Sequence, residues 1–267
     1  MPAPRLVAID LDGTLLRSDG TVSDRTRRAL AAVQARGTTV VLVSARHPAG
    51  LAEVAREAGV GGLAICSNGA SVLDLDTGSL SRLRPVETEL ATRLVKALRE
   101  RVPGILFAVE VRDELAFEQG FSAWDNWEHP PGTRYADALE LVAEPVVRLI
   151  CRHENYALDV LASLVTELVG DTATVVIPGM WTVEVSAAGV NKATALAELC
   201  GELGIDASEV LAMGDYLNDL PMLGWAGRAV AVANAHPDVI AAADEITASN
   251  DDDGVAVVLE RLTGPAD

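Results

Sequence analysis

The sequence predicts an α/β fold in which a doubly wound parallel sheet is interrupted by an inserted second α/β segment. Short apolar runs alternate with amphipathic helical segments near both ends of the chain. Such uninterrupted runs are typical of strands buried on both faces of a parallel sheet. A long middle region breaks this alternation, and the 267 residues suffice for one large domain or two smaller ones.

The first strand is predicted at residues 6–9, LVAI, which contain no polar residue. Ser23 is expected to cap a helix that ends at Gly37. TTVVLVSAR (38–46) follows as a second buried strand and HPAGLAEVAREAGV (47–60) as a short amphipathic helix. We expect right-handed crossovers and parallel pairing, because strands and helices alternate.

GLAICSNGA (62–70) is predicted as a third strand, and ASVLDLDTGSLSRLRPV (70–86) as a hairpin that turns at Asp76–Gly78. The alternation resumes with GVNKATALAELCGELGI (189–205), a strong helix. Strands at VLAMGD (210–215) and RAVAV (228–232) and a helix at PDVIAAADEI (237–246) complete the pattern. Matching patterns at both ends indicate one domain of residues 1–84 and 185–267, with residues 85–184 inserted into it.

The bulk composition excludes several classes of protein. There are 39 acidic and 21 basic residues, a formal net charge of −18, and no basic stripe, which argues against nucleic-acid binding. No segment approaches ~18 uninterrupted apolar residues, and the N-terminus lacks the pattern of a secretion signal, so we expect no membrane association. The three cysteines are widely spaced, which favours a reducing cytoplasm. An anionic substrate would need a local cation or a metal.

Polar residues stand just beyond every strand that can be identified with certainty. Ligands of doubly wound sheets bind beyond the carboxyl ends of the strands, so we expect these side chains to meet there. Lys192, at the start of a helix, could reach the same place. The residues at the strand ends are Asp10, Asp12, Ser44, Arg46, Ser67, Asn68, Asp215, Asn218 and Asp219.

These residue types together predict phosphoryl transfer. Carboxylates gathered at one sheet edge repel each other by several kcal/mol unless a cation lies among them. Neither histidine nor cysteine accompanies them, and a hard set of oxygen ligands favours Mg²⁺ over zinc. A lysine and a serine hydroxyl nearby suit phosphate oxygens. Charge neutralisation and positioning dominate the catalysis of that reaction.

Four segments, DLDGTL, VLVSAR, GVNKATAL and GDYLND, resemble the four ordered motifs of the haloacid dehalogenase superfamily of phosphatases. CSNGA, the large insertion and NDDDGVAVVLERL are similar to its Cof-type subfamily, which carries an α/β cap of subclass IIB. The resemblance spans nearly the whole chain. It implies a Rossmann-like core, an inserted cap that selects the substrate, and a Mg²⁺-dependent phosphatase for small phosphorylated metabolites such as sugar phosphates.

The resemblance also implies roles for individual residues. Asp10 would be the nucleophile that forms an aspartyl-phosphate, and Asp12 would be the general acid and base. The sequence departs from the family at Ala45, where glycine is common and a methyl group could crowd the phosphate. The remaining roles are Mg²⁺ binding by the Asp10 carboxylate, the Asp12 carbonyl, Asp215 and, directly or through water, Asp219, and phosphate binding by Ser44, Lys192, Asn218 and the backbone N–H groups of Leu11 and Ala45.

Some residues have both a functional and a structural interpretation. Arg46, Asn68, Trp181 and Asn234 are possible substrate contacts, although an arginine at the surface and asparagines in turns are equally ordinary. The acidic run Asp251–Asp253 is expected to cap a helix rather than to bind a metal. Further candidates for a substrate-facing surface in the insertion are Trp124, Trp127, His129, Arg134, Arg148 and Arg152, although aromatic residues there are more often core.

Three alternative functions remain open at this stage. A phosphomutase would return the phosphoryl group to a sugar instead of to water. A phospho-signalling receiver uses similar residue types, but takes its acceptor aspartate from a later strand in a smaller domain. A silent binding module would be expected to have lost a key carboxylate. The sequence predicts neither the physiological substrate nor the oligomeric state.

Overall fold

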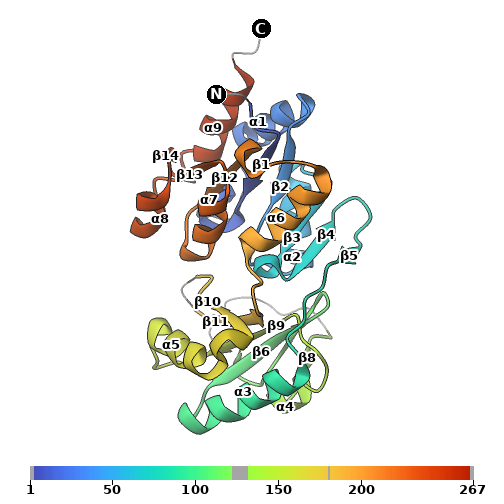
Figure 1. Ribbon diagram of the computed structural model, residues 1–267, viewed down its shortest axis with the longest axis vertical. Coiled ribbons are helices and arrows are strands. Elements are labelled where there is room, and N and C mark those ends of the chain that lie inside the picture. The colour runs from blue at the N-terminus through green and yellow to red at the C-terminus, as the bar shows by residue number, and fades with distance from the viewer. Residues whose placement is uncertain (1–2, 122–131, 180, 265–267) are drawn as a thin grey trace. The chain divides into compact units, whose positions relative to one another are not determined.

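The computed structural model describes residues 3–121, 132–179 and 181–264 and divides into two compact units (Figure 1). The first unit runs to Ser81 and resumes at Asn191, and the second comprises Arg82–Val190. The sequence-based boundaries lie at 84/85 and 184/185. The second of these falls inside β11 (Val183–Ala187), which pairs with two strands of the insertion. A strand cannot be divided without breaking its ladder, so the insertion extends past residue 184.

The first unit contains a five-stranded parallel sheet, which confirms the predicted fold class. The strand order is β14-β13-β12-β1-β2, so the first strand of the chain lies inside the sheet. Ile9 stands in register with Leu42 on one side and Met213 on the other. The strands are β1 (Leu6–Ile9), β2 (Thr39–Leu42), β12 (Val210–Gly214), β13 (Arg228–Ala231) and β14 (Glu245–Ile246).

Helices cover both faces of this sheet, which explains why its strands read as continuous apolar runs. Val7 and Ile9 point to one face, and Leu6 and Ala8 point to the other. Ser23 caps α1 as predicted, because its hydroxyl accepts a hydrogen bond from Thr26 N at 3.0 Å. The first face is packed by α1 (Asp24–Ala35), α2 (Pro48–Ala58) and α9 (Gly254–Thr263), and the second by α6 (Lys192–Leu203), α7 (Leu220–Trp225) and α8 (Pro237–Ala242).

The predicted third strand departs from the parallel pattern. β3 (Leu63–Cys66) pairs antiparallel with β4 (Ser71–Asp74), which continues into β5 (Leu80–Ser81). A single parallel bridge between Val43 and Ile65 joins it to the chain beyond β2. The contact of β3 with the chain beyond β2 is thus parallel, as expected, but is limited to one bridge, and the antiparallel pairing of β3 with β4 was not predicted.

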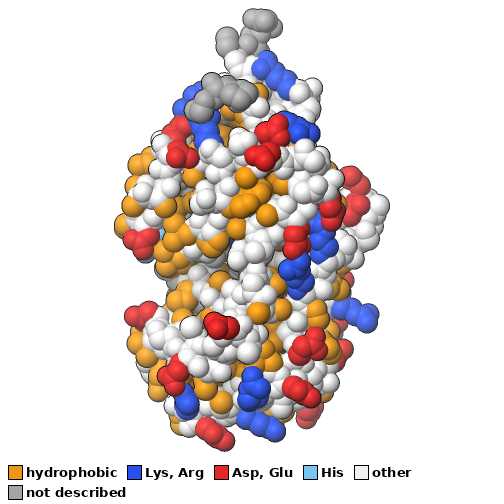
Figure 2. All heavy atoms as spheres, in the orientation of Figure 1, with side chains coloured by type: hydrophobic (Ala, Val, Ile, Leu, Met, Phe, Trp, Pro, Cys, Tyr) orange, Lys and Arg blue, Asp and Glu red, His pale blue; other side chains and the backbone are white. Residues whose placement is uncertain are grey.

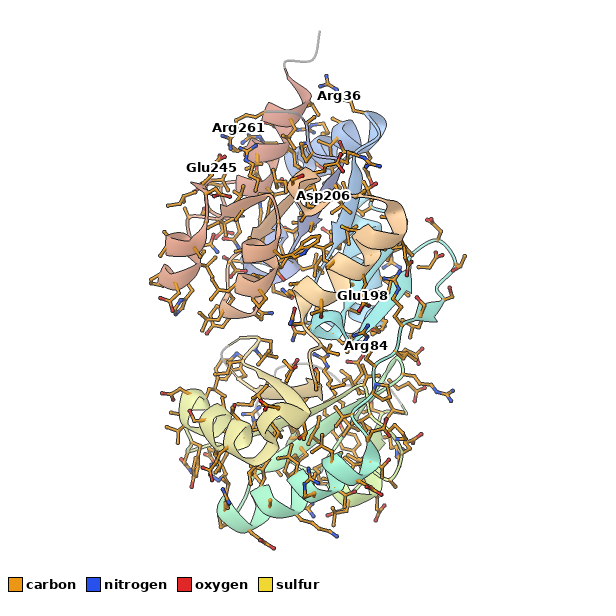
Figure 3. All side chains as sticks on the ribbon, in the orientation of Figure 1. Arg36, Arg84, Glu198, Asp206, Glu245 and Arg261 are labelled. Atoms are coloured by element: carbon orange, nitrogen blue, oxygen red, sulfur yellow. The ribbon has the colours of Figure 1, made fainter. Side chains whose placement is uncertain are left out.

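The predicted helix 237–246 is also shorter than expected. It ends at Ala242, and Glu245–Ile246 forms the edge strand β14 beside β13. Figure 3 shows Glu245 next to Arg261 of α9, and the two form an ion pair. The pairing of Glu245–Ile246 with β13 therefore prevails over the helical pattern that the preceding alanines indicate.

The acidic run before α9 only partly fulfils its predicted role. Asp253 stands at the N-cap position, but its backbone is left-handed, with φ 58°, and its side chain makes no capping hydrogen bond. The carboxylate instead receives a hydrogen bond from Arg17 at 2.7 Å. The run therefore precedes a helix as predicted, while its last side chain links two distant parts of the sequence.

The second unit is built on a six-stranded, mostly antiparallel sheet with the order β10-β11-β9-β6-β7-β8. Three helices pack against one face around Phe107, Leu149 and Val185. These elements are α3 (Thr88–Arg101), α4 (Ala138–Leu141), α5 (Leu158–Val169), β6 (Leu106–Val111), β7 (Glu114–Phe117), β8 (Arg134–Tyr135), β9 (Arg148–Arg152) and β10 (Ala173–Val176).

Two candidate substrate contacts of this unit have partners within the same unit. Arg148 is buried between Glu110 and Glu184, with N–O separations of 2.7 and 2.8 Å. The guanidinium of Arg152 lies 5.8 Å from the centre of the Phe121 ring. Arg134 is exposed and lies 3.5 Å from Glu144. Trp124, Trp127 and His129 fall outside the described residues.

Figure 2 shows acidic and basic side chains dispersed over the visible face rather than gathered into one patch. Within the described ranges, no helix has the length and apolar character needed to cross a membrane.

Candidate functional site

The carboxyl ends of the central strands bring the first predicted site residues together. Asp10 directly follows β1 and Asp215 directly follows β12, and Asp10 N donates a hydrogen bond to Met213 O at 3.0 Å. Val43 N, just beyond β2, donates to Ile9 O at 2.9 Å. The parallel register thus places Asp10 between the ends of its two neighbouring strands.

Asp10, Asp215 and Asp219 form a compact acidic cluster at this edge. One carboxylate oxygen from each lies within 4.8 Å of the others. Lys192 at the start of α6 extends into the cluster, and its ammonium donates to Asp10 Oδ1 at 2.6 Å and to Asp219 Oδ1 at 2.5 Å. The Lys192 residue is only 1% exposed, so this ammonium is held by carboxylates rather than by bulk water.

The electrostatics of the cluster leave an excess of negative charge. Burial raises the pKa of Asp10 well above its ordinary value, and Asp219 adds to this effect while Lys192 opposes it. Burial and Asp219 likewise raise the pKa of Asp215 to about 6. Burial lowers the pKa of Lys192, but attraction to Asp10 and Asp219 outweighs this, so that the pKa is raised and the lysine is charged. Three carboxyl groups around one ammonium, with oxygen-only donors, could hold a divalent hard cation.

Asp219 is engaged at both of its oxygens. Its Oδ1 accepts from Lys192, and its Oδ2 accepts from the backbone N–H groups of Asp215 and Tyr216 at 3.0 and 3.1 Å. The side chain is fully buried. Asp219 therefore fixes both the lysine and the turn that carries Asp215.

The turn after β1 is shaped by its contact with Asp215. Gly13 has φ 82°, and a Cβ atom at this position would lie 2.4 Å from Asp215 Oδ2. Only glycine fits both the left-handed backbone and this close approach. Thr14 Oγ1 donates to Asp215 Oδ1 at 2.9 Å. Gly13 and Thr14 therefore hold Asp215 in place, a role that the sequence analysis did not assign to them.

Asp12 differs from the other acids because its side chain is 57% exposed. Arg46 binds it through two hydrogen bonds, Nε to Oδ2 at 2.8 Å and Nη2 to Oδ1 at 2.6 Å. This two-pronged geometry is the strong form of an arginine–carboxylate pair. The Asp12 carboxylate is therefore held at the rim of the acidic cluster by a residue considered in the sequence only as a possible substrate contact.

Ser44, Asn68 and Asn218 converge from three different loops. Ser44 is buried, its Oγ accepts from Arg46 N at 3.0 Å, and its carbonyl accepts from Asn68 N at 3.0 Å. Asn218 Nδ2 donates to Asn68 Oδ1 at 3.0 Å. Asn68 has φ 56°, a left-handed conformation that asparagine tolerates better than most residues. Asn68 thus connects the segment that carries Ser44 and Ala45 with the Asn218 side chain.

The two remaining candidates have different surroundings. Asn234 Nδ2 donates to Gly13 O at 2.8 Å, so this side chain contacts the backbone of the turn that carries Asp12. Trp181 belongs to the second unit and is 66% exposed. Sequence reasoning did not single out Asn250, which also binds this turn. The NDDDG segment that contains it was noted as a family feature and for the capping role expected of Asp251–Asp253.

A family model described as haloacid dehalogenase-like hydrolase matches residues 7–259. The chain is 29% identical to 5-amino-6-(5-phospho-D-ribitylamino)uracil phosphatase YcsE of Bacillus subtilis (strain 168), over 96% of this chain and 95% of that protein. It is also 29% identical to the HMP-PP phosphatase of Klebsiella pneumoniae (strain 342), over 88% and 86% of the two chains. A solved sugar phosphatase of HAD subclass IIB shares the fold, with a TM-score of 0.83, 22% identity, and coverage of 96% of this chain and 98% of that one.

The shared ammonium predicts a pH-dependent loss of stability when it is removed. We expect Lys192→Met to lower the free energy of unfolding by about 3–5 kcal/mol at pH 8, because two buried carboxylates lose their partner. The loss should be smaller at pH 5. The native pKa values of Asp10 and Asp215 are raised, so these carboxyl groups bind protons more tightly in the folded protein than in the unfolded protein. Proton binding therefore stabilises the fold at low pH, and this stabilisation is lost as the pH rises through the native pKa values.

Urea denaturation at the two pH values measures this difference. Lys96→Met is the matched control, since Lys96 is the other lysine of the chain and is exposed on α3, and it should change the free energy by less than ~0.5 kcal/mol. An equal loss for Lys192→Met at both pH values would mean that packing, and not charge, is what the lysine contributes.

Proposed function

Since the chain belongs to the haloacid dehalogenase-like hydrolases, we propose that it is a Mg²⁺-dependent phosphatase that hydrolyses small phosphorylated metabolites through an aspartyl-phosphate. The observation that carries this proposal is the buried Asp10–Lys192–Asp219 arrangement beside Asp215. The names of two relatives, a phosphoribitylaminouracil phosphatase and an HMP-PP phosphatase, support a small phosphorylated substrate.

The donor set fits a magnesium ion. The Asp10 and Asp215 carboxylates and the Asp12 carbonyl would hold it, with Asp219 contributing directly or through a water molecule. The raised pKa values of Asp10 and Asp215 support this, since both carboxyl groups lie in surroundings that favour an added positive charge. When bound, Mg²⁺ would neutralise the negative charge of the transferring phosphoryl group.

In the first half of the reaction, a carboxylate oxygen of Asp10 attacks phosphorus in line with the ester bond. A new P–O bond forms to Asp10 while the bond to the substrate oxygen breaks, and Asp12 donates its proton to the departing oxygen. Asp10 is suited to this role because its backbone N–H donates to Met213 O and its carboxylate accepts from Lys192, and these two hydrogen bonds fix its position.

In the second half, Asp12 accepts a proton from a water molecule whose oxygen attacks the same phosphorus. The bond to Asp10 breaks, inorganic phosphate leaves, and both aspartates return to their starting protonation states. Lys192, Ser44 and Asn218, with the backbone N–H groups of Leu11 and Ala45, would hold the phosphate oxygens through both steps. Arg46 and Asn68 remain proposed contacts close to this set.

We expect metal-dependent release of inorganic phosphate from members of a panel of sugar phosphates, nucleotides and related monoesters. EDTA should abolish it, and Asp10→Asn should lower kcat by at least ~10³-fold, because the amide is a poor nucleophile. Product analysis by phosphate assay and mass spectrometry separates hydrolysis from return of the phosphoryl group to a sugar. Full activity in EDTA, or in Asp10→Asn, would refute the mechanism.

The proposed role of Asp12 predicts a large loss of turnover without a loss of fold. Asp12→Ala should lower kcat at least ~10²-fold through the missing proton transfers. Its effect on thermal stability should be small, because Asp12 and Arg46 are partly exposed. Near-native turnover in this variant, measured with the best substrate of the panel, would remove Asp12 from the chemistry.

Metal binding should depend on pH in a direction set by the raised pKa of Asp215. Protons compete with the metal below about pH 6. Addition of Mg²⁺ should therefore raise Tm more at pH 8 than at pH 5, and Asp215→Asn should remove most of the increase. Calorimetry or differential scanning fluorimetry measures the shift. A larger shift at pH 5 than at pH 8 would place metal binding elsewhere.

A further inference from the structure

Two asparagine side chains hold the turn that carries Asp12. Asn234 Nδ2 donates to Gly13 O at 2.8 Å, and Asn250 Nδ2 donates to Leu16 O at 2.9 Å. The two asparagines are also joined, because Asn250 N donates to Asn234 Oδ1 at 2.9 Å. A continuous chain of hydrogen bonds therefore runs from Gly13 through both asparagines to Leu16.

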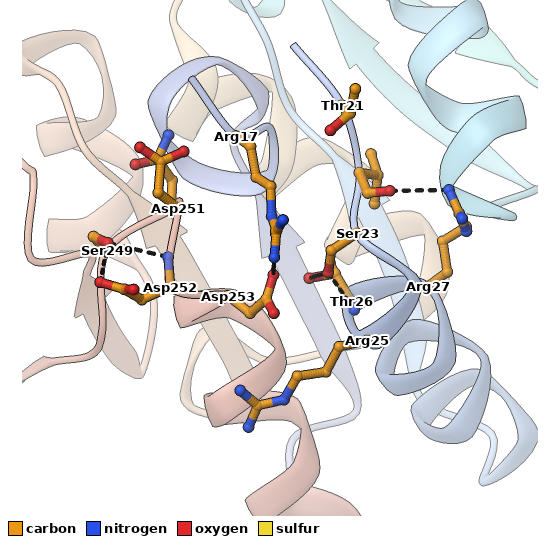
Figure 4. A network of polar contacts seen from close by, with 12 residues as sticks. Arg17, Thr21, Ser23, Arg25, Thr26, Arg27, Ser249, Asp251, Asp252 and Asp253 are labelled. Carbon is orange, nitrogen blue, oxygen red and sulfur yellow. Dashed lines mark hydrogen bonds and ion pairs between the residues drawn. The ribbon is translucent and has the colours of Figure 1, made fainter. Parts of the chain in front are cut away.

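The segment that carries Asn250 is itself firmly attached to the chain beyond this turn. Arg17 binds Asp253, and Asp251 accepts from Ser18 N at 2.8 Å and from Ser18 Oγ at 2.7 Å. Figure 4 shows part of this network, with Arg17 directed at Asp253 and with Ser249 bonded to Asp252. Asn250 thus lies just before two residues, Asp251 and Asp253, that bind the segment to the first twenty residues.

The backbone of this segment has little freedom of its own. Asp253 adopts a left-handed conformation, and a Cβ atom at Gly254 would lie 2.1 Å from Ala248 O. Thr247 Oγ1 donates to Gly254 O at 2.9 Å. A strained backbone persists only where the surroundings determine it, and such positions concentrate at functional sites. These contacts restrict the backbone between Thr247 and Gly254.

Asp12 needs such a support because its side chain is bound to Arg46, a partner that it can release. The carboxylate is half exposed and bound to Arg46, a contact that it must give up when it transfers a proton to or from a reacting group. Its backbone is irregular, with ψ 118° at Asp12 and φ 82° at Gly13, and two backbone hydrogen bonds, Leu15 N to Asp10 O at 3.2 Å and Leu16 N to Leu11 O at 2.9 Å, span the turn. The asparagine amides hold two carbonyls of the stretch that immediately follows Asp12.

We propose that Asn234 and Asn250 are positioning residues that fix the Asp12 turn and so place its carboxylate for proton transfer. The inference rests on the proposed function and assigns a role to the NDDDG segment beyond preceding a helix. Neither asparagine touches the reacting atoms in this role. Misplacement of a catalytic group by about 1 Å can lower the rate ~10²-fold. Loss of either amide should therefore slow the proton transfers by Asp12.

The test compares two substrates that differ in their need for a proton. Phenyl phosphate releases a basic phenolate, whereas 4-nitrophenyl phosphate releases an anion that leaves without help. For Asn234→Ala and Asn250→Ala we expect kcat/KM to fall at least ~10-fold with phenyl phosphate and less than ~3-fold with 4-nitrophenyl phosphate. Asn234 is exposed, so its variant keeps the test valid should Asn250→Ala fold poorly.

The matched control is Arg25→Gln. Arg25 pairs with Glu260 at 2.6 Å, so this variant weakens the contact between α1 and α9 without touching the turn. It should leave kcat/KM unchanged for both substrates. In an Asp12→Ala background, Asn250→Ala should cause no further loss, because both changes remove the same proton transfer. Equal losses with the two substrates, or additive losses in the double variant, would overturn the inference.

Amide hydrogen exchange followed by mass spectrometry provides a readout that needs no activity. Amides of residues 11–16 should exchange faster in both asparagine variants than in the wild-type protein, and not in Arg25→Gln. Unchanged exchange would overturn the inference even in an active enzyme. An inactive wild-type protein with faster exchange in the variants would instead refute the proposed phosphatase and support the holding of the turn.

Discussion

The site depends on one buried ammonium shared between two carboxylates. Lys192 crosses from the start of α6 to bind Asp10 and Asp219, and Asp219 in turn binds the backbone of the Asp215 turn. Without this positive charge, the pKa values of Asp10 and Asp215, which burial and Asp219 already raise, would be raised further. The same arrangement still leaves net negative charge, so it both permits the cluster and makes it a place for a divalent cation.

The parallel sheet is what brings these groups together from distant parts of the sequence. Strands in register end at a common edge, so residues about 200 positions apart meet without any long loop. Close backbone contact then completes the geometry, because Gly13 has no side chain to keep Asp215 away. The fold brings the strand ends together, and glycine at position 13 allows the turn after β1 to approach Asp215 closely.

Patterns carried by single elements could be predicted from the sequence, and contacts between elements largely could not. The buried strands of the first unit and the cap at Ser23 followed from periodicity and local chemistry. The antiparallel pairing of β3 and the strand at Glu245–Ile246 did not, because a neighbouring strand decides them. For the same reason, residue type identified the acids and Lys192 as candidates, whereas the Asp12–Arg46 pair and the two asparagine amides depend on side chains whose loops meet only in the folded chain.

The proposed mechanism demands different mobility from its two first aspartates, and their surroundings differ accordingly. A nucleophile attacks along one line, and Asp10 is buried and held by a lysine that is itself held. An acid that becomes a base must serve first a leaving group and then a water molecule, and Asp12 is half exposed with a partner it can release. Mobility of the side chain is useful only if its backbone stays in place. The asparagine contacts to Gly13 and Leu16 therefore complement the Arg46 pair: they restrict the turn while the carboxylate remains able to move.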